Sequence, residues 1–273
     1  MDKPRIINGI CEFCGIPAEK CQHYAIVPKQ SFGGDHSNKE YYSTSQKIAD
    51  LVIPHHTNHN DLNSLLKMID VSLFNIIICS GQSFGINCNK GASIATTDKI
   101  IFLNDDIEIS NEQLIKIVNT LDYYDFVGST QLAGIVNPTK YWGIGLFKDG
   151  EDKVYHSIAV EKNKTIFPSG FLFGVKKDIW NFVGGFNEEF KTGNEDVDFG
   201  LRMLDSNAKI KILDLEIKHK ESQSVGRFKY CQENEDLFYN IWDQKTLKEI
   251  YYNNYENFDS LPYDDLDLRQ SNV

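Results

Sequence analysis

The stretch IIFLNDDIEI, residues 100–109, joins four apolar residues directly to Asn104, Asp105 and Asp106. A short apolar run of this kind predicts a buried strand. Two adjacent carboxylates at its end can be ordinary solvated charges. They can also hold a metal ion, because carboxylate oxygens are the ligands that hard divalent cations prefer. The pattern of the rest of the chain decides between these two interpretations.

Apolar runs alternate with amphipathic stretches around this strand. The runs that predict strands are ADLVIPHH (49–56), LFNIIIC (73–79), KIIFL (99–103) and DFVGS (125–129). The stretches that predict helices or their ends are DLNSLLKMI (61–69), GASIATT (91–97) and SNEQLIKIVNTL (110–121). We expect Pro54 to stop the first strand, and Ser110 to cap its helix with Gln113 in the capping-box position. Alternating strands and helices predict an α/β fold with a mostly parallel sheet, whose ligands bind beyond the carboxyl ends of the strands.

Composition limits the class of protein. The 273 residues are 41% hydrophobic, enough for a sizeable core, and no apolar run approaches the ~20 residues that cross a bilayer. The N-terminus does not resemble a signal peptide, so we expect a cytoplasmic protein without a membrane anchor, whose six cysteines stay reduced. A net charge of −11 argues against a broad nonspecific nucleic-acid surface.

Composition also divides the chain into three regions. Residues 1–47 are polar and carry cysteines, residues 48–225 hold the alternating elements, and residues 226–273 form an acidic extension. Within the extension, LFYNIWDQKTLKEIYY (237–252) predicts a helix that packs on the core.

A second group of acidic residues occurs in PSGFLFGVKKDIWNFVGGFNEEFKTGNEDVDFGLRM, residues 168–203. This segment predicts a strand that begins near Ser169, a short helix closed by glycines, and a second helix that begins at Glu195 and Asp196. Acidic residues are favourable at any helix start, so taken alone they need no functional explanation. Asp198 and Arg202, four residues apart, predict an ion pair within this helix.

The order and spacing of these segments resemble the family-2-type glycosyltransferases of the GT-A fold, which move a sugar from a nucleotide-sugar donor to an acceptor. The resemblance covers roughly residues 48–222 and rests on LVIPHHTNHNDLNSLL (51–66), GINCNKGASIATTDKIIFLNDDIEIS (85–110) and the block 168–203. Its most specific part is the Gly-Gly-Phe turn followed by Glu-Asp-x-Asp. The resemblance implies a Rossmann-like, mostly parallel sheet flanked by helices.

The resemblance also implies roles for individual residues. Asp196 matches the general base of inverting members, with Glu195 beside it to position the acceptor or the base. Asp106 and His219 match ligands of a divalent cation, Mn²⁺ or Mg²⁺, and the imidazole favours Mn²⁺. Asn104 replaces an acid often found in the metal motif, so we expect a site with one charge fewer and a weaker metal affinity.

Further positions match the donor and acceptor sides of the family. The implied donor-binding residues are Pro54, Asn89, Gly91, Asn104 and Asp105. The implied acceptor-side residues are Ser169, Gly170 and Gly185. One departure concerns the nucleotide base, which family members usually contact through an acid after the second strand. At that place the chain reads ICSGQSFG (78–85), which holds no acid, so the base stays open, with uridine as the default.

The N-terminal region carries Cys11, Cys14, Cys21 and His23 in the spacing C-x2-C-x6-C-x-H. These four side chains can close a tetrahedral zinc site, and the alternative is a set of free or buried thiols. We expect a small structural zinc knuckle. Four other histidines lack clean ligand spacing and remain surface or donor-pocket candidates: His36, His55, His56 and His59.

The sequence therefore predicts an inverting, metal-dependent glycosyltransferase, a hexosyl- or pentosyltransferase. Its acceptor can be a polysaccharide, a protein, a small molecule or a hydroxymethylated DNA base, the last in a phage-encoded enzyme that acts in the host cytoplasm. The alternative is a catalytically inactive GT-A domain that serves as a zinc-knuckle binding module for nucleic acid or protein. A nucleotidyltransferase lacks support, because the chain has no glycine-rich phosphate loop near its first strand.

Overall fold

The computed structural model describes residues 47–55, 59–134, 137–151, 153–220 and 229–255 in full. It also describes the backbone of two short paired strands, β1 (Ile6–Ile7) and β2 (Ile10–Cys11). Three members of the predicted zinc knuckle, Cys14, Cys21 and His23, lie outside the described residues, as does the side chain of Cys11. The zinc site therefore stays a prediction.

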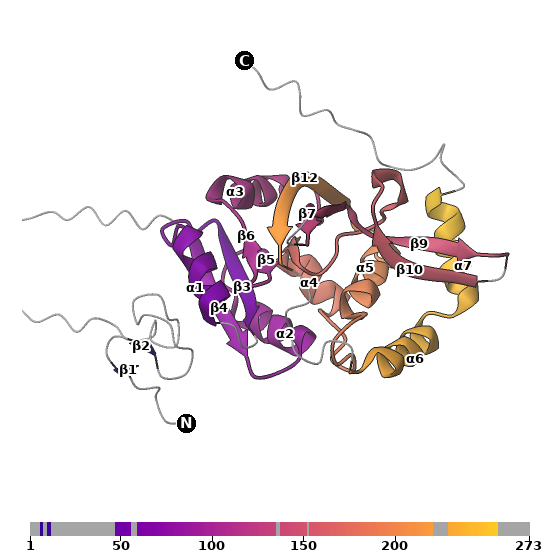
Figure 1. The fold of residues 1–273 in the computed structure, drawn as a ribbon, viewed down its shortest axis with the longest axis horizontal. Coiled ribbons are helices and arrows are strands. Elements are labelled where there is room, and N and C mark those ends of the chain that lie inside the picture. The colour runs from indigo at the N-terminus through magenta and orange to yellow at the C-terminus, as the bar shows by residue number, and fades with distance from the viewer. Residues whose placement is uncertain are drawn as a thin grey trace, which may run out of the picture.

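An eight-stranded sheet forms the centre of the molecule (Figure 1), in the order β4-β3-β5-β11-β7-β12-β6 with β8 beside β7. Its strands are β3 (Ala49–His55), β4 (Phe74–Ser80), β5 (Lys99–Leu103), β6 (Ile107–Glu108), β7 (Phe126–Ala133), β8 (Thr139–Tyr141), β11 (Leu172–Lys176) and β12 (Ile210–His219). The strands β3, β4, β5, β7 and β12 share one direction, and β11 lies antiparallel between β5 and β7. The predicted α/β fold with a mostly parallel sheet is confirmed.

Helices flank this sheet, and a hairpin stands beside it. The helices are α1 (His59–Met68), α2 (Phe84–Ile94), α3 (Asn111–Thr120), α4 (Lys177–Val183), α5 (Glu195–Asp205), α6 (Cys231–Ile241) and α7 (Gln244–Tyr255), with a short 3-10 turn at Lys162–Lys164. The hairpin pairs β9 (Gly143–Asp149) with β10 (Lys153–Ala159), and α7 packs against it (Figure 1). None of the helices that the structure describes has the length and hydropathy to cross a membrane.

Local sequence signals account for several element ends. Ser110 and Gln113 form the predicted capping box of α3, and Gly184 ends α4 in the left-handed region at φ +88°. Two predicted ends were wrong. Strand β3 does not stop at Pro54 but continues through it, because β5 pairs with β3 only as far as Val52 and the missing N–H lies beyond that doubly paired part. Strand β11 begins at Leu172, after Ser169.

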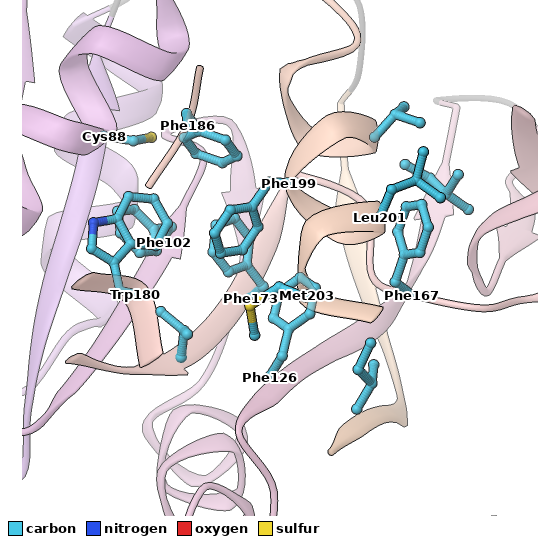
Figure 2. Close-up of a cluster of buried hydrophobic side chains, with 14 of the residues drawn as sticks. Cys88, Phe102, Phe126, Phe167, Phe173, Trp180, Phe186, Phe199, Leu201 and Met203 are labelled. Carbon is cyan, nitrogen blue, oxygen red and sulfur yellow. The ribbon is translucent and has the colours of Figure 1, made fainter. Parts of the chain in front are cut away.

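Both faces of the sheet are buried, as strand periodicity requires. Leu51 and Ile53 of β3 face the cluster that α1 and α3 cover, whereas Val52 between them faces the opposite cluster. Figure 2 shows the second cluster, which is rich in aromatic rings. There the ring of Phe102 stacks on that of Trp180 with centroids 4.5 Å apart. This aromatic cluster joins the central strands to α4 and α5.

The C-terminal helices belong to the same core. Phe238 of α6 and Leu247 of α7 are fully buried, and Trp242 between the helices donates its indole N–H to Asp198 Oδ1 of α5 at 3.0 Å. Gln244 binds both backbone groups of Val154 in β10, at 2.8 and 3.0 Å. The described part of the predicted extension, 229–255, therefore packs as an integral part of the fold.

The close approach of α2 to β3 gives a first prediction. A Cβ atom on Gly91 would lie 2.3 Å from Val52 Cγ1. We expect Gly91→Ala to lower the free energy of unfolding by about 1–3 kcal/mol, because overpacking outweighs the roughly 1 kcal/mol gained in helix propensity. Urea denaturation measures the change. Ser93→Ala on the exposed side of α2 is the matched control, and Val52→Ala in the Gly91→Ala background should restore part of the loss. An unchanged midpoint for Gly91→Ala would refute the packing argument.

A second prediction concerns pH. His156 of β10 is partly buried against the ring of Phe238, at 4.7 Å between centroids, and burial lowers its pKa from 6.5 to about 4. Between these two values the unfolded chain binds more protons than the folded one, so stability falls as the pH falls through this window. We expect this group to contribute a loss of at most about 3 kcal/mol. Melting temperatures between pH 7 and 4 should fall less steeply for His156→Phe than for the wild type. Parallel curves would contradict the assignment.

Candidate active site

The turn after β5 carries Asn104, Asp105 and Asp106 at the sheet edge where the parallel strands end. The chain then enters β6, which pairs antiparallel with the end of β12, so that Ile107 lies opposite His219. This register places the predicted metal ligand of β12 directly beside the predicted metal motif. Asn104 and His219, which are 115 positions apart in sequence, thus meet because β6 pairs with the end of β12.

His219 contacts both Asn104 and Asp106. Its Nε2 atom lies 3.1 Å from Asp106 Oδ1 and 3.2 Å from Asn104 Nδ2. Its Nδ1 atom lies 2.7 Å from Oε1 of Gln131, a buried residue of β7 that the sequence did not single out. The ring of Phe171 stacks on the imidazole at 5.2 Å between centroids. The structure therefore brings the two predicted metal ligands together and holds the histidine from two further sides.

The chemistry of this pair fits a divalent cation. With Nδ1–H donated to Gln131 Oε1, a neutral His219 presents its Nε2 lone pair on the side of Asp106 Oδ1. Ligating histidines commonly donate their other N–H to such an oxygen, which sets the tautomer and the ring orientation. Asp106 and His219 supply two ligands, and no group of three or more His, Cys, Asp or Glu side chains gathers as a metal site within the described ranges. A cation held here would need further ligands from substrate or water.

Asp105 points to the other side of the turn. Its Oδ2 atom lies 2.5 Å from Nδ1 of His55, whose Nε2 atom lies 3.1 Å from Nδ1 of His59. The sequence assigned no definite role to these two histidines. In the structure, His55 contacts the predicted donor-binding carboxylate of Asp105, and His59 contacts His55. The sequence did contain a signal for this contact, because His55 ends β3 at the same sheet edge at which Asp105 follows β5.

The predicted catalytic pair stands at the start of α5. Asp196 Oδ2 accepts a hydrogen bond from the backbone N–H of Gly170 at 2.8 Å. A Cβ atom on Gly170 would lie 3.0 Å from Asp196 Cβ, so glycine lets the two segments approach closely. Glu195 is buried, and its Oε2 atom accepts from the N–H of Gly193 at 2.5 Å.

A two-residue segment connects the two acidic groups. Gly170 binds Asp196, and the next residue, Phe171, stacks on His219 and accepts the backbone N–H of Asn104 at 2.9 Å. The predicted metal ligands Asp106 and His219 therefore lie on one side of this segment, and the predicted catalytic residues Glu195 and Asp196 lie on the other. Ser169, which precedes it, is buried.

Helix α6 holds the loop that leads to the catalytic pair. The buried Asn234 accepts the backbone N–H of Lys191 at 3.1 Å and donates to the carbonyl oxygen of Thr192 at 2.8 Å. Asn194, the residue before α5, has φ +67°. This conformation, which few residues other than glycine adopt, is thus held from outside the loop.

Three of the predicted ligand-binding residues have packing partners in the structure. The side-chain amide of Asn89 binds both the N–H and the carbonyl oxygen of Phe186, each at 2.9 Å. A Cβ atom on Gly185, at φ +68°, would lie 2.5 Å from Asn89 Oδ1. At Gly91 the backbone closely approaches Val52. These residues fasten α2 to β3 and to the Gly-Gly-Phe turn. Pro54 lies at the end of β3, next to His55.

Two comparisons with known proteins give matches. A model of the glycosyltransferase-like family 2 matches residues 38–234. The crystal structure of S. aureus TarS 1–349 superposes with a TM-score of 0.44 at 13% identity, over 63% of this chain and 60% of that one. The chain thus spans less than two thirds of that structure. No curated protein matches it in sequence.

Proposed function

This chain belongs to the glycosyltransferase-like family 2, and from that premise we propose that it is an inverting enzyme that uses a nucleotide-diphosphate sugar and a divalent cation. It is a glycosyltransferase, and the proposal adds the mechanism, the donor class and the cation. The acceptor is a hydroxyl group of a polysaccharide, a protein, a small molecule or a hydroxymethylated DNA base.

The observation that carries the proposal is the pair of contacts made by Gly170 and Phe171. They link Asp196 to the turn that carries Asp106 and to His219. Transfer of a sugar needs stabilisation of the leaving diphosphate on one side and removal of a proton from the acceptor on the other. The two groups have the chemistry for these two tasks, and the two-residue segment Gly170–Phe171 contacts both of them.

On the donor side, Asp106 and His219 would hold Mn²⁺ or Mg²⁺, which when bound neutralises charge that develops on the diphosphate. Gln131 orients the imidazole, and Asn104, whose Nδ2 atom lies 3.2 Å from His219 Nε2, stands in the position of a second acid. The nitrogen ligand favours Mn²⁺ over Mg²⁺. Asp105, on the opposite side of the turn, offers carboxylate oxygen to hydroxyl groups of the donor.

On the acceptor side, Asp196 takes the proton of the acceptor hydroxyl as that oxygen forms its bond to the anomeric carbon. The bond from the anomeric carbon to the diphosphate oxygen breaks, and its electron pair leaves with the diphosphate. The Gly170 N–H holds one carboxylate oxygen in place throughout. Glu195, bound to the N–H of Gly193, fixes the start of α5.

A donor screen tests the proposal. The full chain is incubated with UDP-, GDP- and dTDP-sugars and with Mn²⁺ or Mg²⁺, and mass spectrometry records the release of nucleoside diphosphate. Acceptor arms contain oligosaccharides, protein, small alcohols and hydroxymethylated DNA beside its unmodified counterpart. We expect cation-dependent turnover of one donor class. An absence of turnover across the panel would favour a noncatalytic binding role.

A further inference from the structure

Two histidines hold the Asn104–Asp106 turn from opposite sides, and the mechanism above uses only His219. We infer that His55 and His59 are positioning residues that fix the Asp105 carboxylate for the nucleotide-sugar donor. The inference rests on the proposed function, since it assigns Asp105 to the donor. It is supported by contacts of β3 and α1, which are separate from the contacts that support the proposed function.

His59, His55 and Asp105 form a hydrogen-bonded relay, in which each side chain contacts the next. His55 is only 3% exposed, and its two ring nitrogens contact Asp105 Oδ2 at 2.5 Å and His59 Nδ1 at 3.1 Å. A carboxylate only accepts, so His55 Nδ1–H donates to it. In the neutral imidazole, Nε2 then accepts from His59 Nδ1–H. One hydrogen-bonded chain thus runs from the first residue of α1 through a buried ring to the turn after β5.

The outer end of this chain is itself anchored. Asp61, in the first turn of α1, forms an ion pair with Lys220, the residue that follows His219. The backbone N–H of Lys220 donates to the carbonyl oxygen of Asp106 at 3.2 Å. The start of α1 and the turn are therefore tied to the same strand end, which fixes the distance between His59 and Asp105.

Holding the Asp105 side chain in place matters because a second carboxylate, that of Asp106, is next to it in the chain. Asp105 and Asp106 repel each other, and each has its own imidazole, so the two side chains stay directed to opposite sides of the turn. Asp105 Oδ1 makes no hydrogen bond to any residue in the described part of the chain, and it remains available to a donor hydroxyl. A carboxylate fixed before binding loses less conformational freedom when the donor arrives, which raises affinity.

Three variants test the inference: His55→Ala, His55→Asn and His59→Ala. The donor found by the screen is used for kinetics, and UDP and GDP are used as binding probes in calorimetry with Mn²⁺. We expect His55→Ala to raise the donor KM and the Kd of the bound diphosphate by about 10- to 100-fold, with kcat within about threefold, because a hydrogen bond to a charged group is lost. His55→Asn should restore most of the affinity, since its amide N–H can replace Nδ1–H. His59→Ala should have a smaller effect in the same direction.

The outcomes separate the inference from the proposed function. Wild-type protein that binds a diphosphate but turns over no donor overturns the proposed function, whereas the binding arms still test the relay. Failure of the wild type to bind either diphosphate overturns the relay, as does an unchanged KM and Kd in both His55→Ala and His59→Ala. A loss of kcat that His55→Asn does not restore also overturns it. His156→Phe, in the hairpin away from this site, is the control expected to keep the donor KM, and folding of each variant is checked by its melting temperature.

Discussion

Replacement of Asp196 by Asn is expected to lower kcat for sugar transfer by about 10²- to 10⁴-fold, which is the usual contribution of a general base. Asn retains a carbonyl oxygen that can accept the Gly170 N–H, so the local structure should persist. The amide cannot take the acceptor proton, however, and the attacking oxygen stays a weak nucleophile. The donor KM and the Kd for nucleoside diphosphate should change by less than about threefold, because the residue proposed to bind the donor, Asp105, lies on the turn after β5.

The matched control for this prediction is Asp198→Asn on the same helix. Asp198 is buried and binds Arg202 at 2.7 Å and the indole of Trp242 at 3.0 Å, so its carboxylate is structural. We expect this variant to lose thermal stability, because one partner of a buried ion pair is removed. Steady-state kinetics with the screened donor, together with melting curves, distinguish the two variants. Equal kcat for Asp196→Asn and the wild type would show that the proton is accepted elsewhere.

The second large effect is expected from Asp106→Ala. The variant removes the one carboxylate that contacts His219 in the described part of the chain. We expect kcat/KM to fall at least about 100-fold, since metal ions supply several kcal/mol of transition-state stabilisation. Affinity for Mn²⁺, measured by electron paramagnetic resonance or calorimetry in the presence of diphosphate, should fall in parallel. Neither effect should be recovered by excess Mg²⁺, because Mg²⁺ in proteins is also bound through one or two carboxylates and the variant removes this one.

The neighbouring carboxylate of Glu108 provides the control for the metal prediction. It is exposed and pairs with Lys218 at 2.9 Å, on the same short stretch of chain but outside the site. Glu108→Ala should keep both Mn²⁺ affinity and turnover, because an exposed ion pair contributes little to structure. An Mn²⁺ affinity that is unchanged in Asp106→Ala would overturn the assignment of the cation to this turn.

Much of the fold could be predicted where the signal is local. The capping box at Ser110 and Gln113, the helix end at Gly184 and the ion pair of Asp198 with Arg202 all involve residues within one helical turn or at a helix end. Their geometry depends on nearby backbone and not on the rest of the molecule. The exception, Pro54, shows the limit, because its tolerance depends on which neighbouring strand pairs there.

The candidate site was only partly predictable. The sequence by itself determined which residues have the chemistry for the reaction, from Asp106 and His219 to Asp196, because their order and spacing resemble a known family. Only the tertiary structure shows which segments Asn89 and Gly91 pack against, and that His55 reaches Asp105 across 50 positions. The physical reason is that strand and helix patterns report on which face a residue occupies. They carry no information on which distant side chain lies across from it, which sheet order, register and packing determine.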